Sequence, residues 1–169
     1  MKQIIVIILI VNGIFLSYKN IKYIKTKTNT LKQCVLMFEN IELMLKYNIL
    51  STKEIYYKLI ITKNYRNILF LKSFLHAIEE NRFNDDFIME EIKKKKNSKY
   101  FDYDDLDNLE SFFINFGTSD VNSQISNCSF YKNIFTKKLT KQENIENEKI
   151  KTTTALIYAF TIIFIIIIL

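Results

Sequence analysis

The chain has 169 residues, which leaves room for one domain and little else. Hydrophobic residues make up 49% of the chain and charged residues 25%. There is no proline and there are only two glycines, so the residues that tight hairpin turns need are scarce and an all-helical fold is favoured. The net charge of +6 comes without a nucleic-acid-binding motif, and we expect no nucleic acid as a partner.

The first apolar segment runs from residue 3 to about residue 18 and contains no charge. As a helix it would be about 24 Å long, slightly less than the thickness of a hydrocarbon core. A secretory signal peptide is the alternative, but no small-residue cleavage site follows and the chain continues into the lysines of residues 19–27. We therefore predict a retained transmembrane anchor over residues 1–18.

A first long helix is predicted between residues 21 and 47, where apolar residues recur with the spacing of one helix face. Glu42 lies in the middle of that face, at nearly the same angle as Val35 and Phe38. A carboxylate there needs a hydrogen-bonding or cationic partner, or lies at an interface with another subunit. A glutamate at the rim of the core is the alternative, and the sequence leaves both open.

Capping residues predict the next three helices. Ser51 and Glu54 form an S-x-x-E capping box at the start of the second helix. Asn64 is a candidate cap for a third helix, and Asn84 starts a fourth that ends in the lysines 93–96. That lysine run is expected to be a solvated helix end and not a ligand site.

A fifth helix is predicted from Asp102 to Gly117, since glycine suits a left-handed C-terminal cap. The aspartates near its start lack the glycine and the glutamate of a calcium loop, so no metal is expected there. A sixth helix is predicted to begin at Ser119 or Asp120. Beyond it, residues 141–151 are mostly charged or polar but contain no helix breaker, and we expect a helical stalk.

The last segment, residues 152–169, is uncharged to its end and long enough to cross a membrane. Lysines flank both apolar segments on the side of the middle domain, which the positive-inside rule places in the cytoplasm. The predicted organisation is an anchor at 1–18, a cytoplasmic helical-bundle domain at 19–151 that ends in the stalk, and an anchor at 152–169. Both termini are then expected outside.

Catalytic groups are scarce in the sequence. His76 is the one histidine, and a lone histidine on a helix is more often a surface or core residue than a general base. Cys34 and Cys128 each lie on an apolar helix face, so we expect buried free thiols and neither a disulfide nor a zinc site. A phosphate-binding loop is also missing, and the prediction is a non-enzymatic protein without catalytic residues, metal or cofactor.

Two short segments carry a family resemblance. One is IELMLKY at residues 41–47 followed by STKE at 51–54, and the other is FGTSDVNSQ at 116–124. Together with the apolar ends, they resemble the stage III sporulation protein AB family. Met44 departs from the family pattern, in which a second glutamate is usual. The matching residues, to which the resemblance assigns partner-binding or structural roles, are Glu42, Tyr47, Glu54, Gly117, Asp120 and Gln124.

The resemblance extends to the two apolar ends. Gly13 lies near the end of the first anchor, and Ala155 and Ala159 stand where the family has glycines. The two alanines keep a small-xxx-small spacing, which permits close helix contact in lipid. Transmembrane packing is therefore implied at these three positions.

The resemblance implies a function that spacing alone does not show. Family members are similar to the type II secretion F platform-protein domain, so the implied fold is a bundle of about six helices between two transmembrane helices. The implied role is a platform in the outer forespore membrane that docks a cytoplasmic ATPase and performs no chemistry. Implied partners are the stage III sporulation protein AA-type ATPase, other stage III sporulation membrane proteins, the lipid bilayer and further copies of the chain. A small bilayer-perturbing or stress-related membrane protein is the alternative.

Overall fold

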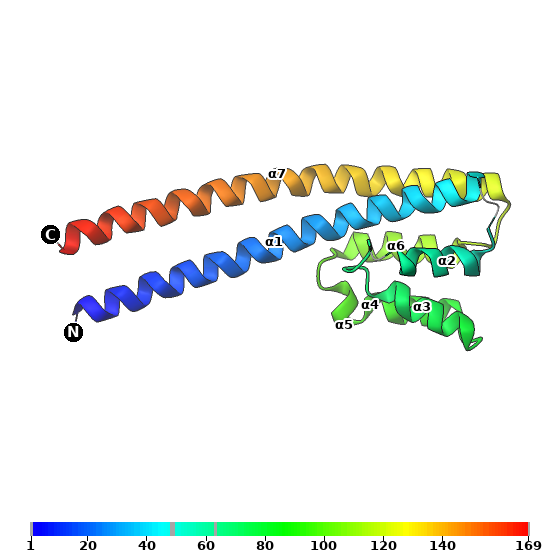
Figure 1. Cartoon of the computed structure of the whole chain (residues 1–169), viewed down its shortest axis with the longest axis horizontal. Helices are drawn as coiled ribbons and strands as arrows, with labels where there is room; N and C mark the ends of the chain where they lie inside the picture. The colour runs from blue at the N-terminus through cyan, green and yellow to red at the C-terminus, as the bar shows by residue number, and fades with distance from the viewer. Residues whose placement is uncertain (1, 48–49, 63, 169) are drawn as a thin grey trace. The chain divides into compact units, whose positions relative to one another are not determined.

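The computed structural model of the chain describes residues 2–47, 50–62 and 64–168, and these residues form helices and loops without a strand. The all-helical prediction is confirmed (Figure 1). The helices are α1 (Lys2–Tyr47), α2 (Thr52–Ile61), α3 (Phe70–Glu79), α4 (Asp85–Lys93), α5 (Lys95–Ser98), α6 (Tyr103–Asn115) and α7 (Val121–Ile168).

The chain divides into two compact units. The larger, Asn29–Leu139, contains the C-terminal part of α1, the short helices α2 to α6 and the first part of α7. We call it the helical unit. The other unit consists of Met1–Thr28 and Thr140–Leu169, the remaining parts of α1 and α7. The predicted domain boundaries at residues 19 and 151 stay predictions.

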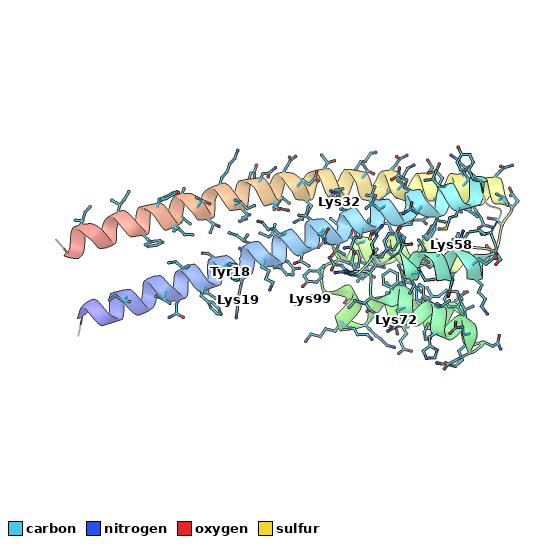
Figure 2. All side chains as sticks on the ribbon, viewed as in Figure 1. Tyr18, Lys19, Lys32, Lys58, Lys72 and Lys99 are labelled. Carbon is cyan, nitrogen blue, oxygen red and sulfur yellow. The ribbon has the colours of Figure 1, made fainter. Side chains whose placement is uncertain are left out.

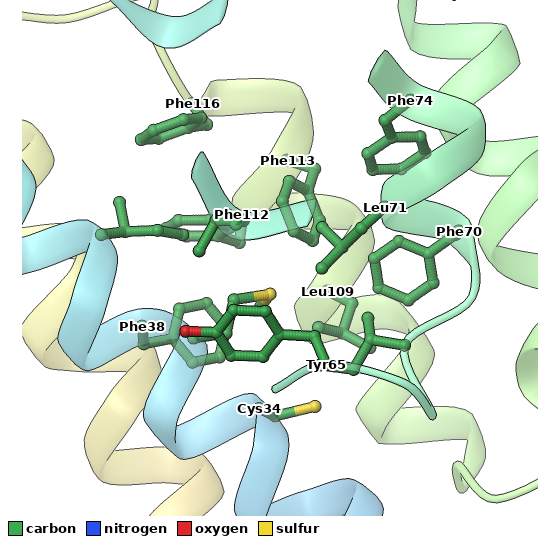
Figure 3. Packing of buried hydrophobic residues seen from close by; sticks show 14 of the residues in the cluster. Cys34, Phe38, Tyr65, Phe70, Leu71, Phe74, Leu109, Phe112, Phe113 and Phe116 are labelled. Carbon is green, nitrogen blue, oxygen red and sulfur yellow. The ribbon is translucent and has the colours of Figure 1, made fainter. Parts of the chain in front are cut away.

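Phenylalanine rings make up much of the core of the helical unit (Figure 3). Phe38 of α1 contacts Phe112 of α6 edge to face, with ring centroids 4.8 Å apart, and Phe135 of α7 at 5.3 Å. Phe113 of α6 contacts Phe74 of α3 at 5.2 Å. Such tilted and edge-to-face pairs are the favoured aromatic geometries. The consecutive residues Phe112 and Phe113 therefore join α1 and α7 to α3 through one continuous core.

Local capping signals predicted several helix ends correctly. The backbone N–H of Ser51 donates to Glu54 Oε2 at 2.8 Å, and the capping box at the start of α2 is complete. Asn84 Oδ1 accepts from the N–H of Phe87 at 2.8 Å and caps α4. Gly117, just beyond α6, has a φ of +90°, the left-handed conformation expected of a glycine cap.

The predicted start of the third helix at Asn64 is wrong, because α3 begins only at Phe70. The segment between α2 and α3 is held instead by side chains of α1. Gln33 Oε1 accepts from the N–H of Asn67 at 2.9 Å. This tertiary contact accompanies the turns at residues 64–67, although the sequence there offers a helix cap.

The lysine run 93–96 does not form one helix end. Lys94 has an extended backbone, with a ψ of 133°, and it separates α4 from the short helix α5. The fourth helix therefore ends within the predicted lysine run, at Lys93, and the rest of the run begins a separate short helix.

The first and last helices are longer than predicted. α1 continues through residue 21 without a break, and α7 continues through residues 141–151 to Ile168. Neither stretch contains a proline or a cap that would end a helix. Residues 141–151 are helical throughout.

In the part of the chain that the structure describes, none of the helices contains a stretch of sufficient length and apolarity to span a membrane. The two predicted anchors, 1–18 and 152–169, therefore gain no support from the structure. Many of their side chains lie outside the described residues. The anchors remain predictions from the sequence.

One tyrosine of the core is buried without a polar partner. Tyr56 on α2 packs among the rings of Phe74, Phe83, Phe113 and Phe116, and no described residue hydrogen-bonds its hydroxyl. Burial raises the pKa of this hydroxyl, which keeps it protonated and neutral.

We expect Tyr56→Phe to raise the free energy of unfolding by about 1 kcal/mol, because it removes a buried polar group that has no described partner. Tyr65→Phe is the matched control. The Tyr65 hydroxyl accepts from Asn40 Nδ2 at 2.5 Å, so this change should cost about 1 kcal/mol. Urea denaturation of both variants checks the pair. Equal losses at the two tyrosines would contradict the prediction.

Candidate functional site

The histidine and the two cysteines, residue types that often act in catalysis, lie in different surroundings. His76 is exposed on α3, with Nδ1 3.5 Å from Glu80 Oε1. Cys34 and Cys128 are buried free thiols, as predicted. Burial raises the pKa of Cys34 well above its usual value and that of Cys128 to about 12, so both stay protonated at neutral pH. Among the described residues, no group of His, Cys, Asp and Glu side chains is arranged to hold a metal ion.

Glu42 is buried and links α1 to α7. Its side chain accepts hydrogen bonds from Lys46 Nζ at 2.6 Å and from Lys132 Nζ at 2.7 Å. The bonds from Lys132 and Lys46 lower the pKa of Glu42, so the carboxylate is charged at neutral pH although it is only 8% exposed. Of the two alternatives for this residue, the structure shows the buried position with cationic partners.

A second buried carboxylate links α6 to α7. Asp105 is 1% exposed, and its Oδ1 accepts from Lys138 Nζ at 2.5 Å. Its Oδ2 accepts from the backbone N–H of Asp102 at 2.9 Å, at the start of α6. The sequence predicted only an acidic helix start here. The one available signal was the spacing of Asp102 and Asp105, which is that of a capping box.

A third buried carboxylate, Glu91, holds the junction of α4 and α5. It accepts from Lys94 Nζ at 2.6 Å and from Asn97 Nδ2 at 3.0 Å. Burial raises the pKa of Glu91, but the hydrogen bonds from Lys94, Ser73 and Asn97 outweigh burial and lower it. Lys93, Lys95 and Lys96 are exposed, as predicted, while Lys94 is partly buried and neutralises a carboxylate that the sequence analysis missed.

The helical unit also has an open apolar groove, formed by α1, α2 and the start of α3. It consists of two adjoining hollows of about 600 and 260 Å³, which share Leu59 and Tyr65 as lining residues. The described residues of its lining include three cations and no carboxylate. The cations are Lys58, Arg66 and Lys72, of which Figure 2 labels Lys58 and Lys72. Sequence analysis did not predict this groove.

Comparison with models of known protein families gives one match. The model of the family described as stage III sporulation protein AB matches residues 2–169. The chain belongs to this family. No significant match to a curated protein or to a solved structure was found.

Membership in the stage III sporulation protein AB family confirms the resemblance predicted from residues 41–54 and 116–124. It also fixes the broad class, because the family is one of sporulation proteins and is not a known enzyme family. The match covers nearly the full chain, including the helical unit and both apolar ends.

Several residues that match the family pattern lie at helix ends. Tyr47 is exposed at the C-terminus of α1, and Glu54 completes the cap of α2. Asp120 Oδ1 accepts from the N–H groups of Asn122 and Ser123, which caps α7. Glu54 and Asp120 thus stabilise helix ends. The partner-binding roles that the resemblance assigns stay predictions.

Gln124 and Gly117 lie close to the loop between α6 and α7. Gln124 Nε2 donates to the carbonyl of Ser119 at 2.7 Å, within the same turn. Gly117 approaches the first turn of α2, where a Cβ on the glycine would lie 2.5 Å from Thr52 Oγ1. The structure therefore brings Gly117 to the helix start that Glu54 caps, while Glu42 lies in a separate cluster with Lys132.

The three small residues of the family resemblance lie in the long helices. Gly13 belongs to α1, and a Cβ placed on it would meet no described atom within 4 Å. Ala155 and Ala159 are exposed on α7. Their role in packing within a membrane stays a prediction.

Proposed function

We propose that the chain is a non-enzymatic platform component of the complex between mother cell and forespore that endospore formation requires. The observation that carries the proposal is the match of a stage III sporulation family to residues 2–169. The proposed partners are a stage III sporulation protein AA-type ATPase, which would dock on the helical unit, and other stage III sporulation membrane proteins. Self-association of the chain is a further part of the proposal.

The internal contacts of the helical unit support a mechanical role. Glu42 with Lys132 joins α1 to α7, and Asp105 with Lys138 joins α6 to α7. Together with the aromatic core, these contacts hold the ends of α1 and α7 against the short helices. A load on the helical unit would then pass along two continuous helices, because neither α1 nor α7 is interrupted.

We further propose that the apolar ends attach the chain to the outer forespore membrane, with the helical unit in the mother-cell cytoplasm and both termini outside. The support comes from the sequence, since residues 3–18 and 152–169 carry no charge and lysines lie next to both. In this arrangement residues 141–151 form a stalk between the helical unit and the second anchor.

The experiment replaces the stalk in an endospore-forming host that lacks its own copy of the gene. A flexible Gly-Ser segment of the same length is expected to reduce heat-resistant spores to the level of the gene deletion, because a coil cannot transmit a directed load. The matched control is a helical Ala/Glu/Lys segment of equal length, which should retain spore formation. Both proteins must be present in the membrane fraction at equal amounts.

Normal sporulation with the flexible stalk would contradict load transmission. Loss of the protein from the membrane fraction with both apolar ends intact would contradict the proposed attachment. Co-purification of the full chain with the ATPase tests docking separately, and failure to recover the ATPase would argue against that part of the proposal.

A further inference from the structure

The groove of the helical unit exposes large apolar side chains on several elements. Five of its lining residues are between 45 and 78% exposed: Leu43, Tyr47, Tyr57, Ile61 and Leu69. Contiguous exposed apolar surface on a folded unit indicates a binding site, whereas scattered apolar residues do not. The side chains belong to α1, α2 and the segment before α3, so the packing of these elements creates the surface.

The charged residues described in the groove are all positive. Lys58, Arg66 and Lys72 belong to its lining, and no described carboxylate lies within ion-pair distance of any of the three. Hydrogen bonds from Ser51 and, to a lesser extent, the charge of Lys58 one helical turn away lower the pKa of Glu54, and its carboxylate is bound to Ser51 in the cap of α2. A partner that brings its own carboxylates would therefore be favoured.

Several lysines elsewhere in the helical unit are paired with carboxylates. Lys46 and Lys132 bind Glu42, Lys93 binds Glu110, and Lys138 binds Asp105. The framework cations are thus paired, whereas the three cations at the groove have no described carboxylate partner, as is also the case for the exposed Lys95 and Lys137 outside it.

We propose that this groove binds one amphipathic helix of a partner protein, whose apolar face fills the two hollows and whose flanking Asp and Glu residues pair with Lys58, Arg66 and Lys72. Helices bind such grooves through apolar anchors spaced by three or four residues. The charge complementarity sets the preference for an acidic partner and speeds the encounter. The inference deepens the proposed function, because it states the chemistry of a docking partner.

An anionic lipid surface has related chemistry, but the shape of the groove favours a helix. Its apolar side chains border hollows that can accept the side chains of a helix, whereas interfacial lipid binding is typical of an amphipathic helix with one continuous apolar face. Lipid binding is therefore the competing outcome of the experiment.

The experiment measures fluorescence anisotropy with the purified full chain in neutral detergent. The probe is a labelled 18-residue helical peptide with leucines at i, i+3, i+4 and i+7 and glutamates on the flanks. A second peptide carries lysine at every glutamate position, and detergent without protein gives the background. We expect the acidic peptide to bind at least about tenfold more tightly than the basic one, a difference of about 1.4 kcal/mol.

Variants of the chain locate the binding. The double variant Lys58→Glu with Lys72→Glu should weaken the acidic peptide about tenfold or more, and Tyr57→Ser should weaken both peptides. The matched control, Lys95→Glu with Lys137→Glu, reverses two exposed lysines outside the groove and should leave binding unchanged. Circular dichroism confirms that each variant is folded.

Equal binding of the two peptides, or acidic-peptide binding unaffected by the change at Lys58 and Lys72, would overturn the proposal. Binding of phosphatidylglycerol vesicles that depends on Lys58 and Lys72, without binding of the acidic peptide, would overturn it in favour of lipid. The stalk experiment leaves the groove intact, so its failure affects the platform role alone. Failure of the peptide to bind affects the groove alone.

Discussion

Glu42→Gln is expected to lower the free energy of unfolding at pH 7 by about 2 kcal/mol. The neutral amide keeps the shape of the side chain, but it withdraws the charge from Lys46 and Lys132, which lie 2.6 and 2.7 Å from the carboxylate. The bond to Lys132 joins α1 to α7, so the effect should exceed that of an exposed pair within one helix. Urea denaturation of the two proteins measures the difference.

The pH dependence of this difference identifies its cause. The hydrogen bonds from Lys132 and Lys46 lower the pKa of Glu42 in the folded chain, so the charged form stabilises the fold above the unfolded pKa of about 4.3. That stability is lost as the pH falls through the lower, folded pKa. The gap between wild type and Glu42→Gln should therefore be full at pH 7 and should shrink as the pH falls below about 4.

Two controls separate the ion pair from general acid sensitivity. Other carboxylates with a lowered pKa, among them Glu54 and Glu91, affect both proteins equally and cancel in the difference. Lys132→Met in a double-mutant cycle with Glu42→Gln should show a coupling energy of about 1 kcal/mol or more. A gap that stays constant from pH 7 to pH 3, or additive changes in the cycle, would contradict the assignment.

Signals that act within a few residues were readable from the sequence. The caps at Ser51 and Asn84 and the left-handed Gly117 each depend on atoms within one helical turn, and the structure has all three. The apolar period of α1 also placed Glu42 on the buried face. The partner Lys132 was not predictable, because it lies 90 residues further along the chain.

Features that depend on contacts between distant elements were missed. The bond between Gln33 and Asn67, 34 residues apart, accompanies a loop where a helix was predicted. Asp105 belonged to a predicted acidic helix start, and its ion pair with Lys138 depends on α7, 33 residues further along the chain. The groove belongs to the same class, since it exists only once α1, α2 and the segment before α3 are packed together.

Gly117→Ala is expected to lower the free energy of unfolding by about 2 kcal/mol. An L-residue at the observed φ of +90° is strained, at a cost of about 1 to 2 kcal/mol. The new Cβ would also lie 2.5 Å from Thr52 Oγ1, so the first turn of α2 must shift or Thr52 must change rotamer. Thermal and urea denaturation of the full chain measure the loss.

The companion changes separate backbone strain from the clash. Thr52→Ala removes the hydroxyl that the new Cβ would meet, so it should recover part of the loss and leave the part due to φ. Gly13→Ala is the matched glycine control, because Gly13 is helical and its Cβ would meet no described atom within 4 Å; it should cost nothing. Complete recovery by Thr52→Ala would show that φ carries no cost. Wild-type stability of Gly117→Ala would instead mean that the loop before α7 adopts another backbone conformation without loss. In the expected case, glycine at position 117 permits both the positive φ and the close approach of the loop after α6 to the capped start of α2, which is a structural reason for its match to the family pattern.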